Sequence, residues 1–183
     1  MKQVATLALI LLAGMAAGCA TDRDTTDEAA TRSGVSSQDR NFVTKAAQSN
    51  QAEIALASLA SQKSRSPAVQ QYADRMITDH RNANAQLLEK AQDEGIVAPQ
   101  AIAPEHAKMR DQLADLSGRE FDREYLSSQV SMHQEAVNLF RLQAQNGQSA
   151  ELRSFARETL PVLEGHLTMA QQLAARAGVS MAE

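Results

Sequence analysis

Four residues of metal-ligand type stand where a helical sequence normally places apolar side chains. They are Glu53, His80, His133 and His166, one in each of four stretches with helical periodicity. A carboxylate or an imidazole on a buried helix face is costly unless it is paired or bound. One such residue near the middle of each stretch predicts that the four side chains converge inside a helical bundle.

Three imidazoles and one carboxylate suit a single transition-metal ion. Zn, Fe, Mn, Cu and Ni all accept these donors, and ligand type alone does not choose among them. A lone His at a core position is more often only hydrogen-bonded, and Glu53 could pair with one protonated His. Three interpretations therefore stay open: a shared metal site, a buried Glu–His hydrogen-bond network, and no convergence.

Residues spaced three and four apart define the buried stripe of each helix. In the first two helices the stripes are Phe42, Ala46, Ser49, Glu53, Leu56 and Ala60, and then Val69, Ala73, Met76, His80, Ala83 and Leu87. In the last two they are Leu126, Val130, His133, Val137, Phe140 and Ala144, and then Leu152, Ala156, Thr159, Leu163, His166, Ala170 and Leu173. The four ligand-type residues all fall on these stripes.

The positions of these residues along the helices agree only in part with a common depth in the bundle. Glu53 and His80 lie 12 and 15 residues from the turn that joins their helices. His133 and His166 lie 14 and 19 residues from the turn at Gly147. The mismatches of three and five residues correspond to about 4.5 and 7.5 Å along a helix axis. A proline inside the last helix is expected to bend it and reduce the larger mismatch.

Turn and capping residues mark four long helices and one short one. The expected ranges are 37–63, 67–94, 104–116, 117–146 and 149–178. The expected N-caps are Ser66, Ser117 (in a capping box with Glu120) and Ser149. The glycines expected to end helices are Gly95 and Gly178.

Two tight hairpins joined by the long connection 96–117 predict an all-α, ferritin-like four-helix bundle with a crossover between helices 2 and 3. An up-down-up-down bundle with a loose middle loop is the alternative. No stretch alternates in the manner of a strand. The bundle domain is expected to span 38–178, followed by a tail at 179–183.

The N-terminal residues 1–18 are typical of a lipoprotein signal peptide. A positively charged start precedes an apolar run that is too short to span a bilayer. Small residues then precede Cys19, which resembles a lipobox, although Ala16 stands where that motif usually has Leu. Cys19 is the only cysteine, so lipidation explains a thiol that cannot form an intramolecular disulfide. Cleavage after Ala20, giving a soluble periplasmic protein, is the alternative.

Residues 19–37 have too few apolar side chains to fold and are predicted to be a disordered tether behind the lipid. The residue after Cys19 is not Asp, which by resemblance to lipoprotein sorting rules indicates the outer membrane, facing the periplasm. The net charge is −4 and no basic patch occurs, so nucleic acid is not an expected partner. No nucleophile elbow, HExxH motif or phosphate-binding loop is present, so enzymatic activity would have to come from the metal.

Five segments resemble the bacterial family called domain of unknown function 4142. They are QAEIALASLA (51–60), MITDH (76–80), FDREYL (121–126), MHQEAV (132–137) and LPVLEGH (160–166). The resemblance covers roughly residues 38 to 176. It implies a ferritin-like fold in an exported or outer-membrane protein, and it implies no established function.

Di-iron bundles carry a Glu three residues before the liganding His on two of their helices. Here the residues three before the bundle histidines are Ile77, Val130 and Leu163, all apolar. A di-iron centre is therefore not expected, and a single-metal site or none fits better. The sequence favours a metal-binding envelope lipoprotein; the alternative is a non-catalytic structural or stress-related protein whose Glu/His cluster only fixes the helices. The fourth histidine, His106, is expected to be solvated.

Overall fold

The computed structural model describes residues 34–180. It contains α1 (Ser37–Lys63), α2 (Pro67–Asp93), α3 (Pro104–Asp115), α4 (Gly118–Asn146) and α5 (Ala150–Ala177). No strand occurs among these described residues. The all-α prediction is confirmed, and each predicted helix end agrees with the structure to within one residue.

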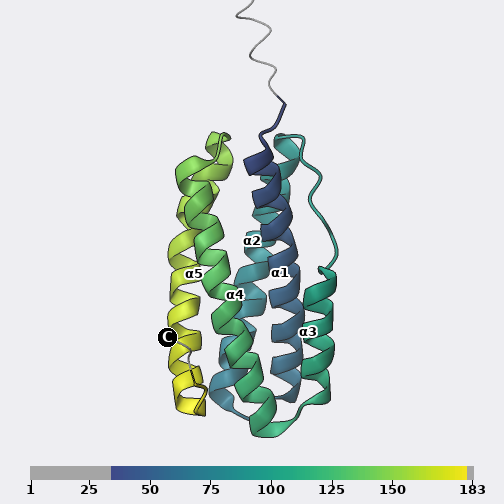
Figure 1. The fold of residues 1–183 in the computed structure, drawn as a ribbon, viewed down its shortest axis with the longest axis vertical. Helices are drawn as coiled ribbons and strands as arrows, with labels where there is room; N and C mark the ends of the chain where they lie inside the picture. The colour runs from purple at the N-terminus through teal and green to yellow at the C-terminus, as the bar shows by residue number, and fades with distance from the viewer. Residues whose placement is uncertain (1–33, 181–183) are drawn as a thin grey trace, which may run out of the picture. The chain divides into compact units, whose positions relative to one another are not determined.

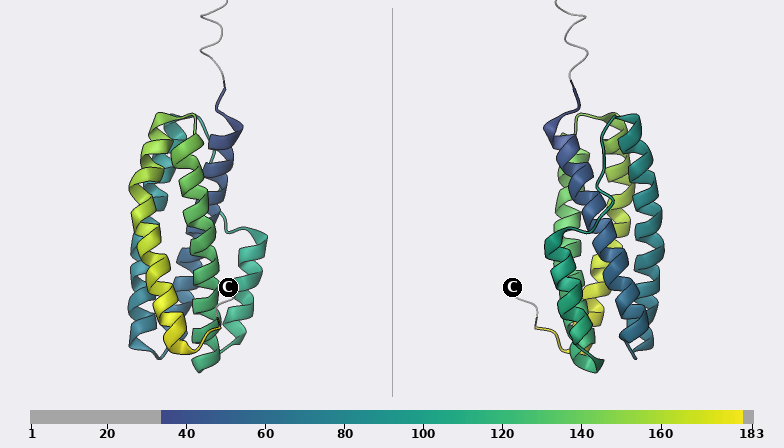
Figure 2. Two further views of the ribbon diagram at one scale, coloured as in Figure 1. Left: turned by 60° about the vertical axis from the view of Figure 1, so that its left-hand side comes forward. Right: turned by 90° about the vertical axis from the view of Figure 1, so that its right-hand side faces the viewer.

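The four long helices form a bundle with one long crossover (Figure 1). α1 and α2 form one antiparallel hairpin, and α4 and α5 form the other. The crossover runs back along the bundle, so that α2 and α4 point the same way, α1 packs beside α4, and α2 packs beside α5. α3 lies outside the bundle against α1 and α4 (Figure 2). The short-long-short connectivity is therefore observed, and the up-down-up-down alternative is not.

Helix ends follow the expected local chemistry at three places. Ser149 Oγ accepts a hydrogen bond from the Leu152 N–H at 3.1 Å and caps α5. Gly95 and Gly178 adopt φ of 70° and 73°, the left-handed conformation that ends a helix at little cost for glycine. The N–H of the residue after each glycine then bonds back to a helix carbonyl.

Two capping predictions are confirmed in position but wrong in their hydrogen bonds. Ser66 and Ser117 occupy the N-cap positions of α2 and α4, but neither side chain makes a capping hydrogen bond. The capping box of Ser117 with Glu120 is therefore not formed. Gly118, the first residue of α4, has φ of 58°, and a capping box needs helical dihedrals directly after the N-cap.

The core consists of two apolar clusters separated by a polar layer. One cluster centres on Phe42, Phe140 and Phe155, whose rings contact one another. The other contains Tyr125 and Phe121, stacked with centroids 6.1 Å apart. The buried polar residues at intermediate depth include Asn50, Glu53, His80, Asn84, Gln129, His133 and His166. This layer holds all four ligand-type residues.

The predicted signal peptide and Cys19 lie outside the described residues, as does most of the predicted tether. No helix within 34–180 combines the length and the apolar character that crossing a membrane requires.

Candidate metal centre

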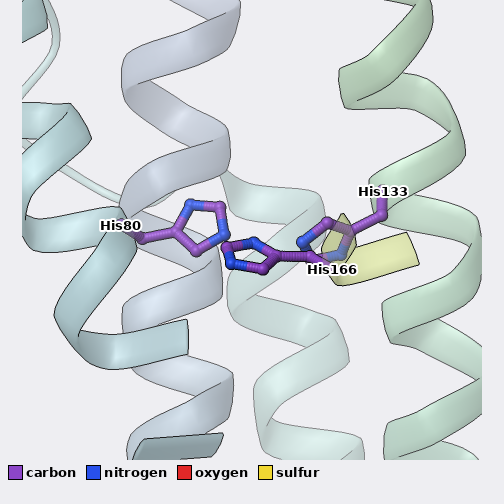
Figure 3. Close-up of side chains that lie close together, drawn as sticks. All are labelled: His80, His133 and His166. Carbon is purple, nitrogen blue, oxygen red and sulfur yellow. The ribbon is translucent and has the colours of Figure 1, made fainter. Parts of the chain in front are cut away.

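Three of the four predicted ligand residues meet in the polar layer. His80 comes from α2, His133 from α4 and His166 from α5, and each exposes 3% of its surface or less. One ring nitrogen from each lies within 4.8 Å of those of the other two. The three rings reach toward one another across the bundle (Figure 3).

The outward nitrogen of each ring is held by an oxygen. The pairs are His80 Nδ1 with Asn50 Oδ1 at 2.9 Å, His133 Nδ1 with the Gln129 carbonyl at 3.0 Å, and His166 Nε2 with Asp79 Oδ2 at 2.8 Å. Each oxygen can accept the ring N–H. In a neutral imidazole the other nitrogen then carries a lone pair, so these partners fix the tautomer of all three rings.

The opposite nitrogens have no such partner. His80 Nε2, His133 Nε2 and His166 Nδ1 are buried and make no hydrogen bond within the described part of the chain. A buried acceptor left unsatisfied costs about 1 to 3 kcal/mol, and native structures carry few of them. Three lone pairs facing one another are the arrangement that a cation would satisfy.

The spacing of the rings fits one metal ion. The centroids of His80, His133 and His166 are 5.5, 5.5 and 5.4 Å apart, nearly an equilateral triangle. The centre of this triangle lies about 3.2 Å from each centroid, which matches a metal–nitrogen bond of about 2.0 to 2.1 Å plus about 1.1 Å from nitrogen to ring centre. Three such nitrogens in a plane lie about 3.5 Å apart, and rotation of the rings about χ2, a soft torsion, brings them to that spacing.

Burial keeps two of these imidazoles, His80 and His166, in the neutral form that binds metals. It lowers the pKa of His80 well below its usual value, and the neighbouring His133 and His166 add to this effect. Burial lowers the pKa of His166 to about 4, against the opposing effect of the hydrogen bond with Asp79. Both rings are therefore neutral at neutral pH, as ligation requires.

Glu53 lies behind His133 and does not belong to the group of three. Its Oε1 is 3.5 Å from His133 Nδ1, and its Oε2 accepts a hydrogen bond from Gln129 Nε2 at 2.7 Å. Burial raises the pKa of Glu53, although His133 and the Gln129 hydrogen bond oppose the increase. Here the carboxylate contacts the outer nitrogen of a potential ligand, an arrangement that orients metal-binding histidines and strengthens their basicity.

Asn50, Gln129 and Asp79 have no role in the predictions made from the sequence. Asn50 and Gln129 lie one helical turn before Glu53 and His133, so polar residues at that spacing on a buried face were the available signal. Gln129 also accepts a hydrogen bond from the Tyr72 hydroxyl at 3.2 Å, which extends the network. Asp79 is partly exposed, and no pattern on the apolar stripe marks it.

The prediction that His106 is solvated needs correction. His106 lies on α3, which packs against the bundle, so the side chain is partly buried and its Nδ1 is enclosed without a partner within the described residues. Its charge would also lower the pKa of Glu53. His106 is nevertheless not part of the three-histidine group.

Fold and site together define a small four-helix-bundle protein whose core is divided by a three-histidine layer. A family model described as "Domain of unknown function (DUF4142)" matches residues 24–173, and the chain belongs to that family. Among curated proteins, no sequence matches this chain.

Three solved structures share the fold. A DUF305 fragment from Deinococcus radiodurans is 21% identical with a TM-score of 0.68, covering 78% of this chain and 99% of its own. CopM in the Cu(II)-bound form is 21% identical with a TM-score of 0.65, covering 75% and 96%. CopM in the Cu(I)-bound form is 20% identical with a TM-score of 0.64, with the same coverage. At this identity the likeness shows the fold alone.

Proposed function

We propose that this protein binds one transition-metal ion through His80 Nε2, His133 Nε2 and His166 Nδ1. One observation carries the proposal: three buried imidazole nitrogens face one another without partners, while an oxygen holds the opposite nitrogen of each ring. A buried hydrogen-bond network would use these nitrogens as well. Glu53 and Asp79 act as outer partners that orient the ligands and compensate the charge of the ion.

Copper is the first candidate for the ion, and zinc is the second. Mn prefers carboxylate and water oxygens, and non-haem Fe(II) sites with two histidines usually add a carboxylate. The inner group here contains nitrogen donors only. Three histidines suit zinc, but divalent copper binds such donors more tightly than divalent zinc does. A copper-bound neighbour of the same fold agrees with this order.

The proposed role is to hold or transfer the ion in the cell envelope. His80, His133 and His166 expose so little surface that a bound ion would be shielded from substrates. Lipidation at Cys19 and a tether over 19–37 would keep the bundle at the outer membrane, facing the periplasm. Storage, buffering or delivery of metal therefore fits better than turnover.

The test is a metal measurement on the untagged full-length chain. Cys19 is changed to Ser in every variant, so that the lone thiol cannot bind the ion. After loading with Cu(II), Cu(I) or Zn(II) and desalting, elemental analysis is expected to give about one ion per chain. His80→Ala, His133→Ala and His166→Ala are each expected to lose it.

His106→Ala is the matched control, because it removes an imidazole outside the centre and is expected to retain the ion. Full occupancy in the three centre variants would exclude this site. No bound metal in the parent chain, with a Tm indifferent to all three ions, would leave the structural role, in which the Glu/His layer only fixes the helices.

A further inference from the structure

Asp79 links the buried centre to solvent. The three histidines are almost fully buried, whereas the Asp79 side chain is 30% exposed. Its Oδ2 lies 2.8 Å from Nε2 of His166, whose Nδ1 is one of the three unpartnered nitrogens. One carboxylate and one imidazole therefore span the distance from the surface to the proposed metal position.

The outer side of Asp79 opens into a hollow between α2 and α5. This hollow has a volume of about 230 Å³, and a second carboxylate, Glu158, lines it. Uncharged oxygens come from Asn82, Gln86 and Thr159. Two acidic groups in one hollow raise the local concentration of cations.

One cation competes for this position. Arg75 Nε lies 3.3 Å from Asp79 Oδ2, and the Arg75 side chain is mostly exposed. An exposed pair of this kind contributes at most about 1 kcal/mol. An arriving metal ion can therefore displace the guanidinium at small cost.

The α5 wall of the hollow is weakened by Pro161, which lies between Thr159 and Val162. Proline has no N–H, so the Arg157 carbonyl loses its usual helical donor. Such a break allows a helix to bend locally.

We propose, resting on the proposed function, that the α2–α5 hollow is the port through which the metal ion enters and leaves. Asp79 takes the ion from water in exchange for Arg75. Rotation of the His166 ring, whose Nε2 faces Asp79, then lets the ion pass to the inward side of the ring, where Nδ1 lies. Glu158 stabilises the ion during this passage and does not contact the final site.

The test measures loading and release rates by stopped flow, with Zn(II) and Cu(II) as probes and a chromophoric chelator as donor or acceptor. The key variant is Glu158→Gln in the Cys19→Ser chain. Glu158 lies eight residues before His166, or about 12 Å along α5, so its charge acts weakly on the bound ion. Loading and release are both expected to slow about threefold, with the Kd unchanged.

Two further variants test whether charges at the hollow change the loading rate in the expected direction. Arg75→Gln is expected to speed loading about threefold, because the competing cation is gone. Asp79→Asn is expected to slow loading about tenfold, and also to raise the Kd because His166 loses a charged partner. Glu151→Gln, which removes an exposed acid in the first turn of α5 that does not line the hollow, is the matched control and is expected to leave both rates unchanged.

Rates in Glu158→Gln and Arg75→Gln equal to those of the parent chain would overturn the port while leaving the metal centre intact. A change in only one of the two rates of Glu158→Gln, and hence a changed Kd, would also overturn it. If the parent chain binds neither probe, the proposed function and the port fall together.

Discussion

Two buried polar clusters of this bundle are built in opposite ways. Asp39, near the start of α1, accepts hydrogen bonds from Ser36 Oγ, Gln143 Nε2 and the backbone N–H groups of Gln148 and Ser149. Four donors thus satisfy one carboxylate. In the histidine layer, by contrast, each ring is satisfied on its outward side and unsatisfied on its inward side.

The difference separates a structural polar cluster from one arranged to bind. Burial alone would raise the pKa of Asp39, but the hydrogen bonds from Ser36, Gln143 and the α4–α5 turn outweigh it and lower the pKa. The carboxylate is therefore charged and ties α1 to the turn between α4 and α5. The three histidines instead leave their inward nitrogens without partners, which stabilises nothing until a ligand arrives.

The largest effect is expected at the satisfied cluster. Asp39→Ala leaves the Gln143 amide and two backbone N–H groups without their acceptor, in a place that is almost fully buried. The free energy of unfolding is expected to fall by about 3 to 5 kcal/mol. Urea unfolding followed by circular dichroism measures this, and the Tm is expected to drop by about 10 °C or more.

Glu94→Gln is the control at the same end of the bundle. Glu94 accepts a hydrogen bond from Ser149 Oγ at a partly buried position, and the amide oxygen of Gln can accept the same bond. A loss below about 1 kcal/mol is expected. Equal losses of unfolding free energy in Asp39→Ala and Glu94→Gln would contradict the view that Asp39 is the main acceptor tying α1 to the α4–α5 turn.

The two clusters are also expected to differ in how their contribution to the stability depends on pH. His166 binds its proton with a pKa of about 4 in the folded state, against the ordinary value of 6.5. Between these values the unfolded chain binds more protons, so stability is highest above pH 6.5 and falls as the pH drops toward 4. The loss from His166 is expected to be about 2 to 3 kcal/mol, measured by urea unfolding with a chelator present.

The same series in His166→Leu is expected to show a smaller loss over that range. Asp39, whose pKa is lowered from 3.8, keeps its charge there and contributes only at more acidic pH. Identical pH profiles for the parent chain and His166→Leu would show that this imidazole is not buried in its neutral form.

Helical periodicity predicted the fold and the three histidines, because a stripe of spacing three and four reports which side of a helix faces inward. It could not predict the partners of the histidines. On α1, Asn50 is buried, whereas Ser49, which the predicted stripe contains, is only half-buried. The buried face of this helix is wider than the predicted stripe and extends to the neighbouring position. Nor could it separate Glu53 from the histidines, since a one-dimensional pattern gives the face of a residue and not its distance from a common point.

The smallest effect is expected where the histidine layer is replaced by apolar side chains. Asn50→Leu with His80→Leu removes both partners of one hydrogen bond together with the unsatisfied His80 Nε2. Replacing both partners by apolar groups can be neutral or stabilising, so the metal-free stability is expected to stay within about 1 kcal/mol of the parent chain. Metal binding and the stabilisation that it brings are expected to disappear. Urea unfolding of both proteins, with chelator and with Cu(II) or Zn(II), measures both effects. A large loss of unfolding free energy without metal would mean that the histidine layer stabilises the fold as Asp39 does.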